Sequence, residues 1–417
     1  MNPEVNTSEL QTQTETPCES AETPIVDEAP ETEEVPDEVI VEKPKRKQPL
    51  ALKLASVLLG AFAVVCIILR LALSRSERAS EVFYMNITRP LQAFFGAVSS
   101  VIPFSLAETL VILLVPICII VLASMIRCLI RRDFFRLCRT LLSLSTVASL
   151  VISTYILNLS VLYCRPSLSS LSGISNEPPE AEDLYVASLV SVLKLDALTK
   201  SGAFAFADSG ASVCPYDFAE LDERINLAFD KYAVENPWIS PHGARAKIIS
   251  LSDYMTYTHI AGMYTPYTGE SNININYPEY IVTSTIAHEK AHQRGIGPED
   301  EANLVAFFVL AESGDPYLEY CGYMSVFYEL MGACRDSSVS VYANNVLPYI
   351  PECVIKEFAA YNAFFKPYVK STASRVANTV NDTYLKLNGE SDGIKSYGMT
   401  VDMTVAYIID AFDLEAD

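Results

Sequence analysis

The chain has 417 residues, which is enough for two or three structural units. It carries 51 acidic and 30 basic residues, and this net charge of −21 excludes nucleic-acid binding through a general basic surface. Hydrophobic residues nevertheless make up 50% of the chain, so acidic and apolar residues must lie in different segments. The ten cysteines form no CxxC pair, which excludes a zinc ribbon or a thioredoxin-type centre.

The first segment is strongly acidic. Residues 1–42 contain 13 acidic residues, no Lys or Arg, and no aromatic residue. Such a segment cannot bury enough apolar surface to offset the entropy of ordering. We therefore expect residues 1–50 to form a disordered acidic tail, which includes a short basic cluster at residues 43–47.

Three apolar runs follow the tail, at residues 54–69, 109–126 and 140–164, and none of them contains a charged residue. A membrane-spanning helix needs about 20 mostly apolar residues. Buried helices of a soluble protein are the alternative, but three closely spaced runs with basic flanks are typical of a membrane protein. The pattern predicts three transmembrane helices within residues 51–164, with the lipid bilayer as their partner.

Basic residues set the expected orientation of these helices. The short loop between the second and third runs, with its flanks, holds Arg127, Arg131, Arg132, Arg136 and Arg139. The longer loop between the first and second runs holds only Arg75, Arg78 and Arg89. The positive-inside rule therefore places the N-terminus in the cytoplasm and residues 165–417 outside a plasma membrane.

Residues 165–417 have the length and composition of a globular domain. Apolar residues at helical spacing predict helices over 184–198, 216–232, 281–294, 298–313, 316–332 and 353–369. Residues 247–252 and 272–277 are expected to be extended, the second because Ile and Tyr alternate with Asn. The fold class is therefore α+β and mostly helical, with a small sheet.

A metal-binding pattern lies in this domain. The chain has four His residues, and two of them fall in the sequence HEKAH at residues 288–292. Positions i and i+4 of a helix lie one above the other, so His288 and His292 can reach one ion. Glu289 can then act as general base on a zinc-activated water. The pattern indicates an open catalytic Zn²⁺ site.

The third ligand is expected from the next helix. Its first turn, after Pro298, resembles the ExxA(D/N) helix of zinc peptidases whose third ligand is a glutamate. This resemblance implies Glu299 as the ligand and Asn303 as its support. Glu301 is the alternative ligand, because the sequence does not fix the rotation of this helix about its axis. A further alternative is that these acidic residues only favour the helix start.

The sequence HEKAHQRGIGPEDEANLVAFF, residues 288–308, resembles an uncharacterised family of bacterial multi-pass membrane proteins with zincin-like features. Residues 262–274, 381–386 and 393–398 share the resemblance, which covers most of residues 50–410. It implies three transmembrane helices followed by a zincin-like metallopeptidase domain, and it supplies no substrate. Pro298 occupies the place of the third His of metzincins, so that class is excluded.

Other polar residues are weaker candidates for substrate contacts. Residues 264–277 precede the HExxH helix, where an edge strand of a zincin commonly pairs with substrate, so Glu270, Asn272 and Asn274 can line the cleft. An ordinary hairpin with a solvated polar face is an equal alternative. Candidate donors to an oxyanion are His259, Tyr323 and Tyr397.

Lys290 and Arg294 flank the two histidines on the same predicted helix. Long basic side chains usually keep their charged ends in water, which favours a solvated helix face over a contact with an acidic substrate.

Three functions fit these observations. The first is a membrane-anchored zinc metallopeptidase that hydrolyses peptide or amide bonds of a peptide or protein substrate. The second is a non-catalytic sensor or binding module that keeps the zincin fold. The third is a structural envelope protein with a fortuitous HExxH. The rarity of His and the presence of Glu289 favour the enzyme.

Overall fold

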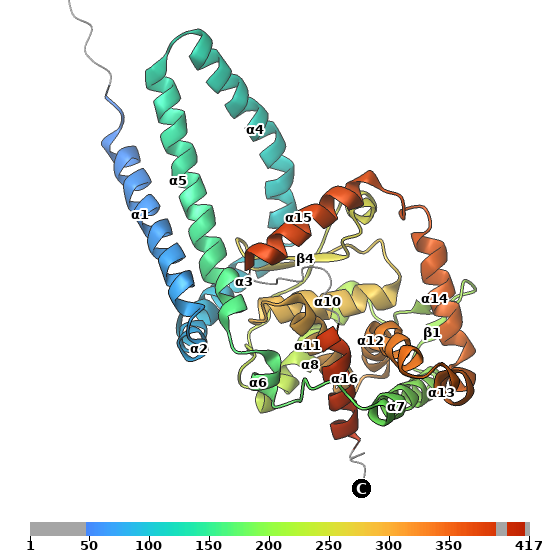
Figure 1. The fold of residues 1–417 in the computed structure, drawn as a ribbon. Helices are drawn as coiled ribbons and strands as arrows, with labels where there is room; N and C mark the ends of the chain where they lie inside the picture. The colour runs from blue at the N-terminus through green and yellow to red at the C-terminus, as the bar shows by residue number, and fades with distance from the viewer. Residues whose placement is uncertain (1–46, 389–397, 413–417) are drawn as a thin grey trace, which may run out of the picture. The chain divides into compact units, whose positions relative to one another are not determined.

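A computed structural model of the chain describes residues 47–388 and 398–412. Contacts divide the chain into residues 1–47 and residues 48–417, and the second segment forms one compact unit. The predicted acidic tail lies outside the described residues, except at its last four positions. The three apolar helices and the helices that follow them belong to the same unit, since their contacts do not separate them (Figure 1).

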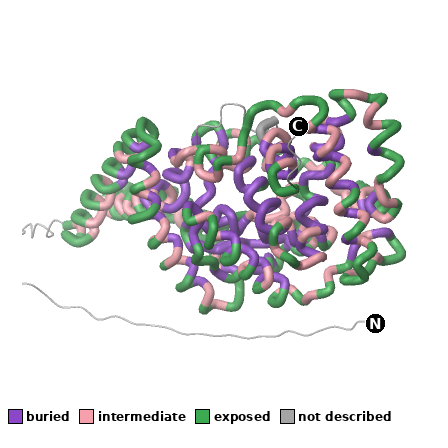
Figure 2. Tube along the Cα trace, turned by 90° about the horizontal axis from the view of Figure 1, so that it is seen from below, coloured by how far each residue is buried: buried purple, intermediate pink, exposed green. Residues whose placement is uncertain are grey.

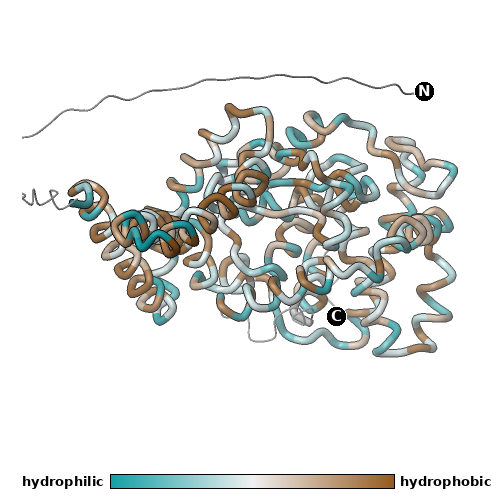
Figure 3. Tube along the Cα trace, turned by 90° about the horizontal axis from the view of Figure 1, so that it is seen from above, coloured by the Kyte–Doolittle hydropathy of each residue, from teal (hydrophilic) through white to brown (hydrophobic). Residues whose placement is uncertain are grey.

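Three helices are long and apolar enough to cross a membrane: α1 (Leu50–Leu73), α4 (Leu106–Ile130) and α5 (Phe134–Asn158). Their hydrophobic side chains are largely exposed, as expected of surfaces that face lipid. Figure 3 colours the chain by hydropathy and shows strongly hydrophobic stretches in brown. The third helix ends six residues before the predicted end of its apolar run. Residues 160–164 form a separate 3₁₀ turn, η2 (Ser160–Cys164).

The segment between α1 and α4 is helical. It comprises α2 (Glu77–Phe83), a π-helical turn η1 (Tyr84–Thr88) and α3 (Arg89–Ser100). Gln92, Gly96 and Ser99 form the buried face of α3. This face packs on the sheet, and Gln92 reaches the backbone carbonyl of His292. This segment therefore belongs to the part of the unit that holds the candidate site.

Most of the remaining described chain is helical, which confirms the mostly helical class. The helices are α6 (Leu168–Ser172), α7 (Ala181–Thr199), α8 (Phe218–Glu235), α9 (Ser252–Met255), η3 (Thr256–Thr258), α10 (Glu279–Gln293), α11 (Glu299–Ala311), α12 (Pro316–Ser337), α13 (Val339–Val341), η4 (Tyr342–Val346), η5 (Leu347–Tyr349), α14 (Glu352–Phe365), α15 (Thr372–Asn388) and α16 (Gly398–Ala411). All six helices predicted from periodicity are present, with shifts of a few residues at their ends.

The described strands form two small sheets. A hairpin joins β1 (Ala205–Phe206) to β2 (Ser212–Val213). The second sheet has the order β3-β5-β4, in which β3 (Lys247–Ile248) is parallel to β5 (Glu270–Ile273) and β4 (Gly262–Thr265) is antiparallel to it. The central strand is β5, and β4 lies at an edge beside α10.

Helix α11 lies in the middle of the main core. All of its residues from Leu304 to Leu310 are buried, because α10, α12, α8 and α16 surround it. Figure 2 shows the buried residues in purple, gathered in the middle of the unit. A helix that is apolar all round needs such complete cover. The first turn of α11 emerges from this core beside the end of α10, and the candidate site forms there.

Candidate metal centre

Three potential ligand side chains meet at the junction of α10 and α11. His288 and His292 lie one turn apart on α10, and Glu299 is the first residue of α11. The Nε2 atom of His288 lies 3.1 Å from Glu299 Oε2 and 3.1 Å from His292 Nε2. The Nε2 atom of His292 lies 3.5 Å from the same carboxylate oxygen. In the described chain this is the group of three side chains that could hold a metal ion.

A tight turn brings the two helices together. Helix α10 ends at Gln293, and Gly295 has a φ of +106°, a left-handed conformation that favours glycine. A Cβ at Gly295 would stand 2.1 Å from the hydroxyl of Tyr84, so the turn is packed closely against η1. Pro298 then precedes α11 at its N-cap and sets Glu299 at the start of the helix.

The distances among the three atoms fit a small tetrahedral cation. Ligands bonded to Zn²⁺ at about 2.0–2.1 Å stand roughly 3.3 Å apart at the corners of a tetrahedron. The Nδ1 atom of His292 lies 2.9 Å from the carbonyl oxygen of Ile296, to which it can donate. That bond leaves Nε2 of His292 free to bind metal. The residues present therefore fit a metal ion with three protein ligands.

The charges of the three groups are coupled. Burial lowers the pKa of His292, but the nearby carboxylates of Glu299 and Glu289 outweigh this effect and raise it to about 9. Burial raises the pKa of Glu299, and the two histidines overcome this and hold it well below the ordinary value. Without a bound metal these shifts favour an ion pair between the Glu299 carboxylate and the His292 ring.

Glu289 is buried beside this group and beneath the edge strand. Its exposed fraction is 5%, and burial raises the pKa of its carboxyl despite the two histidines. A Cβ at Gly262 of β4 would lie 2.7 Å from Glu289 Oε1 and 2.5 Å from a methyl carbon of Thr285. Only a residue without a side chain allows β4 to approach so closely. Glu289 is thus a buried carboxyl between the metal-ligand group and a strand edge.

The two acidic candidates for the third ligand have different surroundings. Glu299 joins the histidines, whereas Glu301 accepts a hydrogen bond of 2.8 Å from the backbone N–H of Leu168 at the start of α6. The rotation of α11, which the sequence does not fix, thus directs Glu299 towards the histidines and Glu301 towards α6. Asn303, the predicted support, is exposed. The Nδ1 atom of His288 is buried and has no hydrogen-bond partner among the described residues.

The predicted cleft residues of β5 and of the segment after it are hydrogen-bonded within the fold. Glu270 accepts hydrogen bonds from the backbone N–H groups of Leu106 and Ala107, at the start of α4. Asn272 accepts one from the Ser105 hydroxyl. Asn274 is buried within the sheet and donates to the carbonyl of Ile260 and the hydroxyl of Thr256. All three side chains are buried, and β5 is the central strand of its sheet.

Two of the candidate oxyanion donors make other contacts. Tyr323 is buried in α12 and packs edge to face against Phe307. His259 has its Nε2 atom 2.8 Å from the carbonyl of Tyr368, and its ring packs on Phe365. Tyr397 lies outside the described residues.

The basic residues of α10 do not form a solvated face. Lys290 makes an ion pair of 2.7 Å with Asp222, and Arg294 makes one of 2.9 Å with Asp230. Asn226, between these two acids on α8, bonds to both basic side chains. Because the three α8 residues are spaced by four, they form one polar ladder against α10. This spacing of Asp222, Asn226 and Asp230 is the feature of the sequence that could have revealed the contact between α8 and α10. The contact fixes the rotation of α10, the helix that carries both histidines.

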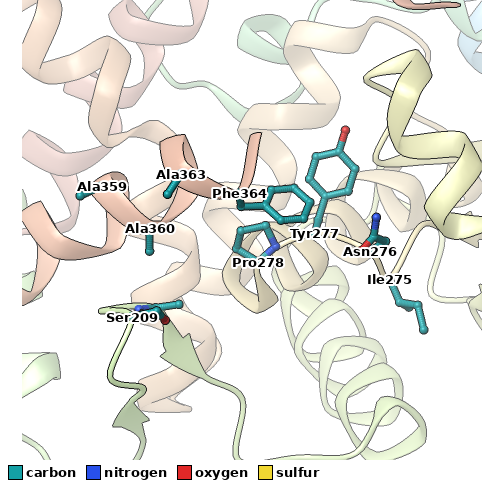
Figure 4. Close-up of a pocket in the computed structure, with 10 residues that line it drawn as sticks. Ser209, Ile275, Asn276, Tyr277, Pro278, Ala359, Ala360, Ala363 and Phe364 are labelled. Carbon is teal, nitrogen blue, oxygen red and sulfur yellow. Dashed lines mark hydrogen bonds between the residues drawn. The ribbon is translucent and has the colours of Figure 1, made fainter. Parts of the chain in front are cut away.

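A separate pocket of about 650 Å³ lies at the other end of α10. Figure 4 shows its wall, in which Tyr277, Pro278 and Phe364 lie close together and Ala360 and Ala363 project from α14. No His, Cys or carboxylate residue lines it. Ten residues of helix, or about 15 Å, separate Pro278 from His288. This pocket is therefore distinct from the metal-ligand group.

Comparison with known proteins places the chain in one family. The model of a family described as a protein of unknown function, DUF3810, matches residues 80–405, and the chain belongs to this family. The match includes α4, α5 and the candidate metal centre, and it confirms membership of an uncharacterised family. No curated protein and no solved structure matches the chain.

Proposed function

We propose that the protein is a membrane-anchored zinc metallopeptidase that hydrolyses peptide or amide bonds. The observation that carries the proposal is the convergence of His288, His292 and Glu299 beside the buried carboxyl of Glu289. A site that only binds metal needs no buried carboxyl next to its ligands, whereas hydrolysis needs a general base there.

The residues have distinct roles in this proposal. His288, His292 and Glu299 hold Zn²⁺, which supplies Lewis-acid chemistry by polarising a carbonyl group and acidifying water. Glu289 accepts a proton from the attacking water and later gives it to the leaving amine. Burial supports this role because it raises the pKa of Glu289 and so makes the carboxylate a stronger base.

The edge strand supports a peptide substrate. β4 pairs with β5 on one side, and no described strand pairs with its other side. An extended peptide can add to such an edge through backbone hydrogen bonds. Gly262 lies where this edge passes Glu289, so a peptide bound there would run past the general base.

The location follows from the basic residues. Arg131 and Arg132 lie between α4 and α5, at the ends of the spans opposite to the site-bearing part. The positive-inside rule places these arginines and the N-terminus in the cytoplasm. The candidate metal centre then faces the outside of the plasma membrane.

The test uses the full chain reconstituted in lipid nanodiscs with a mixed peptide library. We expect hydrolysis that a chelator abolishes and added Zn²⁺ restores. Glu289→Gln should retain zinc and lose the activity, because the amide removes the base and spares the ligands. Hydrolysis at the same rate by Glu289→Gln, or none by zinc-loaded wild type on any peptide, would overturn the peptidase function.

A further inference from the structure

We infer that helix α3 lies against the bilayer and holds the candidate metal centre at the membrane surface, so that the substrate is a membrane-anchored polypeptide cut close to its bilayer boundary. The statement about the substrate rests on the proposed function. The statement about α3 stands on its own observations.

Helix α3 has a buried face and an exposed face, and the distribution of polar and apolar residues between them is unusual. Gln92, Gly96 and Ser99 form the buried face, and they are polar or small. Phe94 and Val98 lie on the opposite face, with exposed fractions of 61% and 51%. A helix on the surface of a soluble domain has the reverse pattern, with apolar residues inside and polar residues outside.

The apolar face continues beyond the helix. Val101 has an exposed fraction of 83% and follows Phe94 and Val98 at helical spacing, and Phe104 is 54% exposed. Residues 90–107 contain no charged residue. An uncharged stretch with a continuous exposed apolar face is typical of a surface that contacts lipid.

The chain itself places the bilayer next to this face. The segment that contains α3 starts where the spanning helix α1 ends and stops where the spanning helix α4 begins. Both ends are therefore fixed at one boundary of the membrane. Lipid is the occupant that this continuity favours, since the same bilayer already surrounds α1 and α4.

Hydrogen bonds connect the candidate metal centre to this boundary of the membrane. The side-chain amide of Gln92 lies 3.0 Å from the carbonyl oxygen of Asn158, the last residue of the spanning helix α5. The same nitrogen lies 3.4 Å from the carbonyl oxygen of His292. One side chain therefore links the end of a membrane span to a proposed zinc ligand.

Helix α15 supplies a second contact at the same boundary. The Asn388 carbonyl accepts a hydrogen bond of 3.1 Å from Arg70 near the end of α1, and its side chain bonds to Tyr155 of α5. Val376 and Val380, one turn apart on α15, are 61% and 63% exposed. Helix α15 therefore also reaches the bilayer boundary, at its last residue.

A catalytic site next to the membrane surface favours substrates that are anchored in the membrane. An extended chain advances about 3.3 Å per residue, so a polypeptide that leaves a transmembrane helix reaches such a site within a few residues. A centre far from the bilayer would instead act on segments remote from the anchor.

The first experiment tests the position of α3 in the full chain. Phe94→Trp and Val101→Trp are reconstituted in phosphatidylcholine–phosphatidylglycerol vesicles, with or without brominated acyl chains. The matched control is Val234→Trp on α8, where the exposed fraction is 81%. The native tryptophan, Trp238, is buried and gives a constant background. We expect the brominated lipid to quench both α3 tryptophans and to spare the control. Equal quenching of all three variants, or of none, would overturn the inference.

The second experiment tests the substrate. A single-span reporter carries three copies of one cleavable peptide in series beyond its transmembrane helix, and it is reconstituted together with the full chain. Mass spectrometry should locate the cut in the copy nearest the bilayer, and His288→Ala should abolish it. Equal cutting of all copies would overturn the substrate inference and leave the peptidase function intact. No cutting by zinc-loaded protein would overturn the peptidase function, while the quenching result would still decide the position of α3.

Discussion

Gly262 of the edge strand lies directly against the carboxyl of Glu289. A side chain at this position would place its Cβ 2.7 Å from Oε1 and 2.9 Å from Cγ of Glu289. Two carbon or oxygen atoms cannot approach so closely without displacement. The backbone of β4 therefore sets where the proposed base can point.

Gly262→Ala should accordingly impair hydrolysis and leave metal binding intact. The methyl group must push Glu289 aside, and misplacement by about 1 Å can cost roughly 100-fold in rate. The matched control is Gly332→Ala in α12, where a Cβ would meet no atom within 4 Å. Zinc content and rate are measured on both variants. Full activity in Gly262→Ala would show that Glu289 is not held by this contact.

Glu299 and Glu301 should behave differently when each is replaced by Ala. Glu299→Ala removes a proposed ligand and should abolish stoichiometric zinc binding. Glu301→Ala should keep zinc but destabilise the fold by about 1–3 kcal/mol, because the buried N–H of Leu168 loses its acceptor. Zinc content and thermal unfolding are measured on each. Loss of zinc in Glu301→Ala, with zinc retained in Glu299→Ala, would reverse the assignment.

The metal-free protein should lose stability as the pH rises. The pKa of His292 is raised to about 9 in the folded protein, above its ordinary value of 6.5. Its stabilising effect is therefore complete below pH 6.5 and is lost as the pH rises through about 9. The pKa of Glu299 is lowered, so its contribution is present above its ordinary pKa and is lost at lower pH.

Thermal unfolding of the chelator-treated chain tests this dependence. The midpoint should be highest near pH 5–6.5 and should fall towards pH 9.5. His292→Ala should remove most of the alkaline decline. An unchanged decline in this variant would assign it to other groups.

Glu270 should matter for folding rather than for substrate. Its two carboxyl oxygens accept the first backbone N–H groups of α4, and it is fully buried. Glu270→Ala leaves these donors unpaired and should cost about 1–3 kcal/mol of unfolding free energy. Glu352→Ala, which removes an exposed ion pair with Lys356, is the control and should have little effect. Equal stability of both variants would contradict the role of Glu270.

Local sequence patterns were sufficient to predict the two helices that carry the candidate metal centre. The spacing of His288 and His292, the glycine after the helix and the proline before the next one predict the turn that α10 and α11 make. Periodicity and capping reveal these features because they depend on residues near one another in the chain. The preference for Glu299 over Glu301 came from the resemblance to the helix of zinc peptidases.

Features that depend on distant partners were not predicted. The polar side chains of β5 resembled a solvated face, but their partners Ser105 and Leu106 lie more than 160 residues earlier. Lys290 and Arg294 looked solvated because the acids that bury them belong to α8. Helix α3 was overlooked because it is short, and its buried face is polar instead of apolar.

The metal content of the full chain tests the central claim most directly. Wild type, His288→Ala, Glu299→Ala and Glu301→Ala are purified in lipid nanodiscs, supplied with zinc, and analysed for bound metal after removal of free ions. We predict one zinc per chain in wild type and in Glu301→Ala, and none in the other two variants. A folded wild-type chain without zinc, or the same zinc content in His288→Ala, would contradict the account.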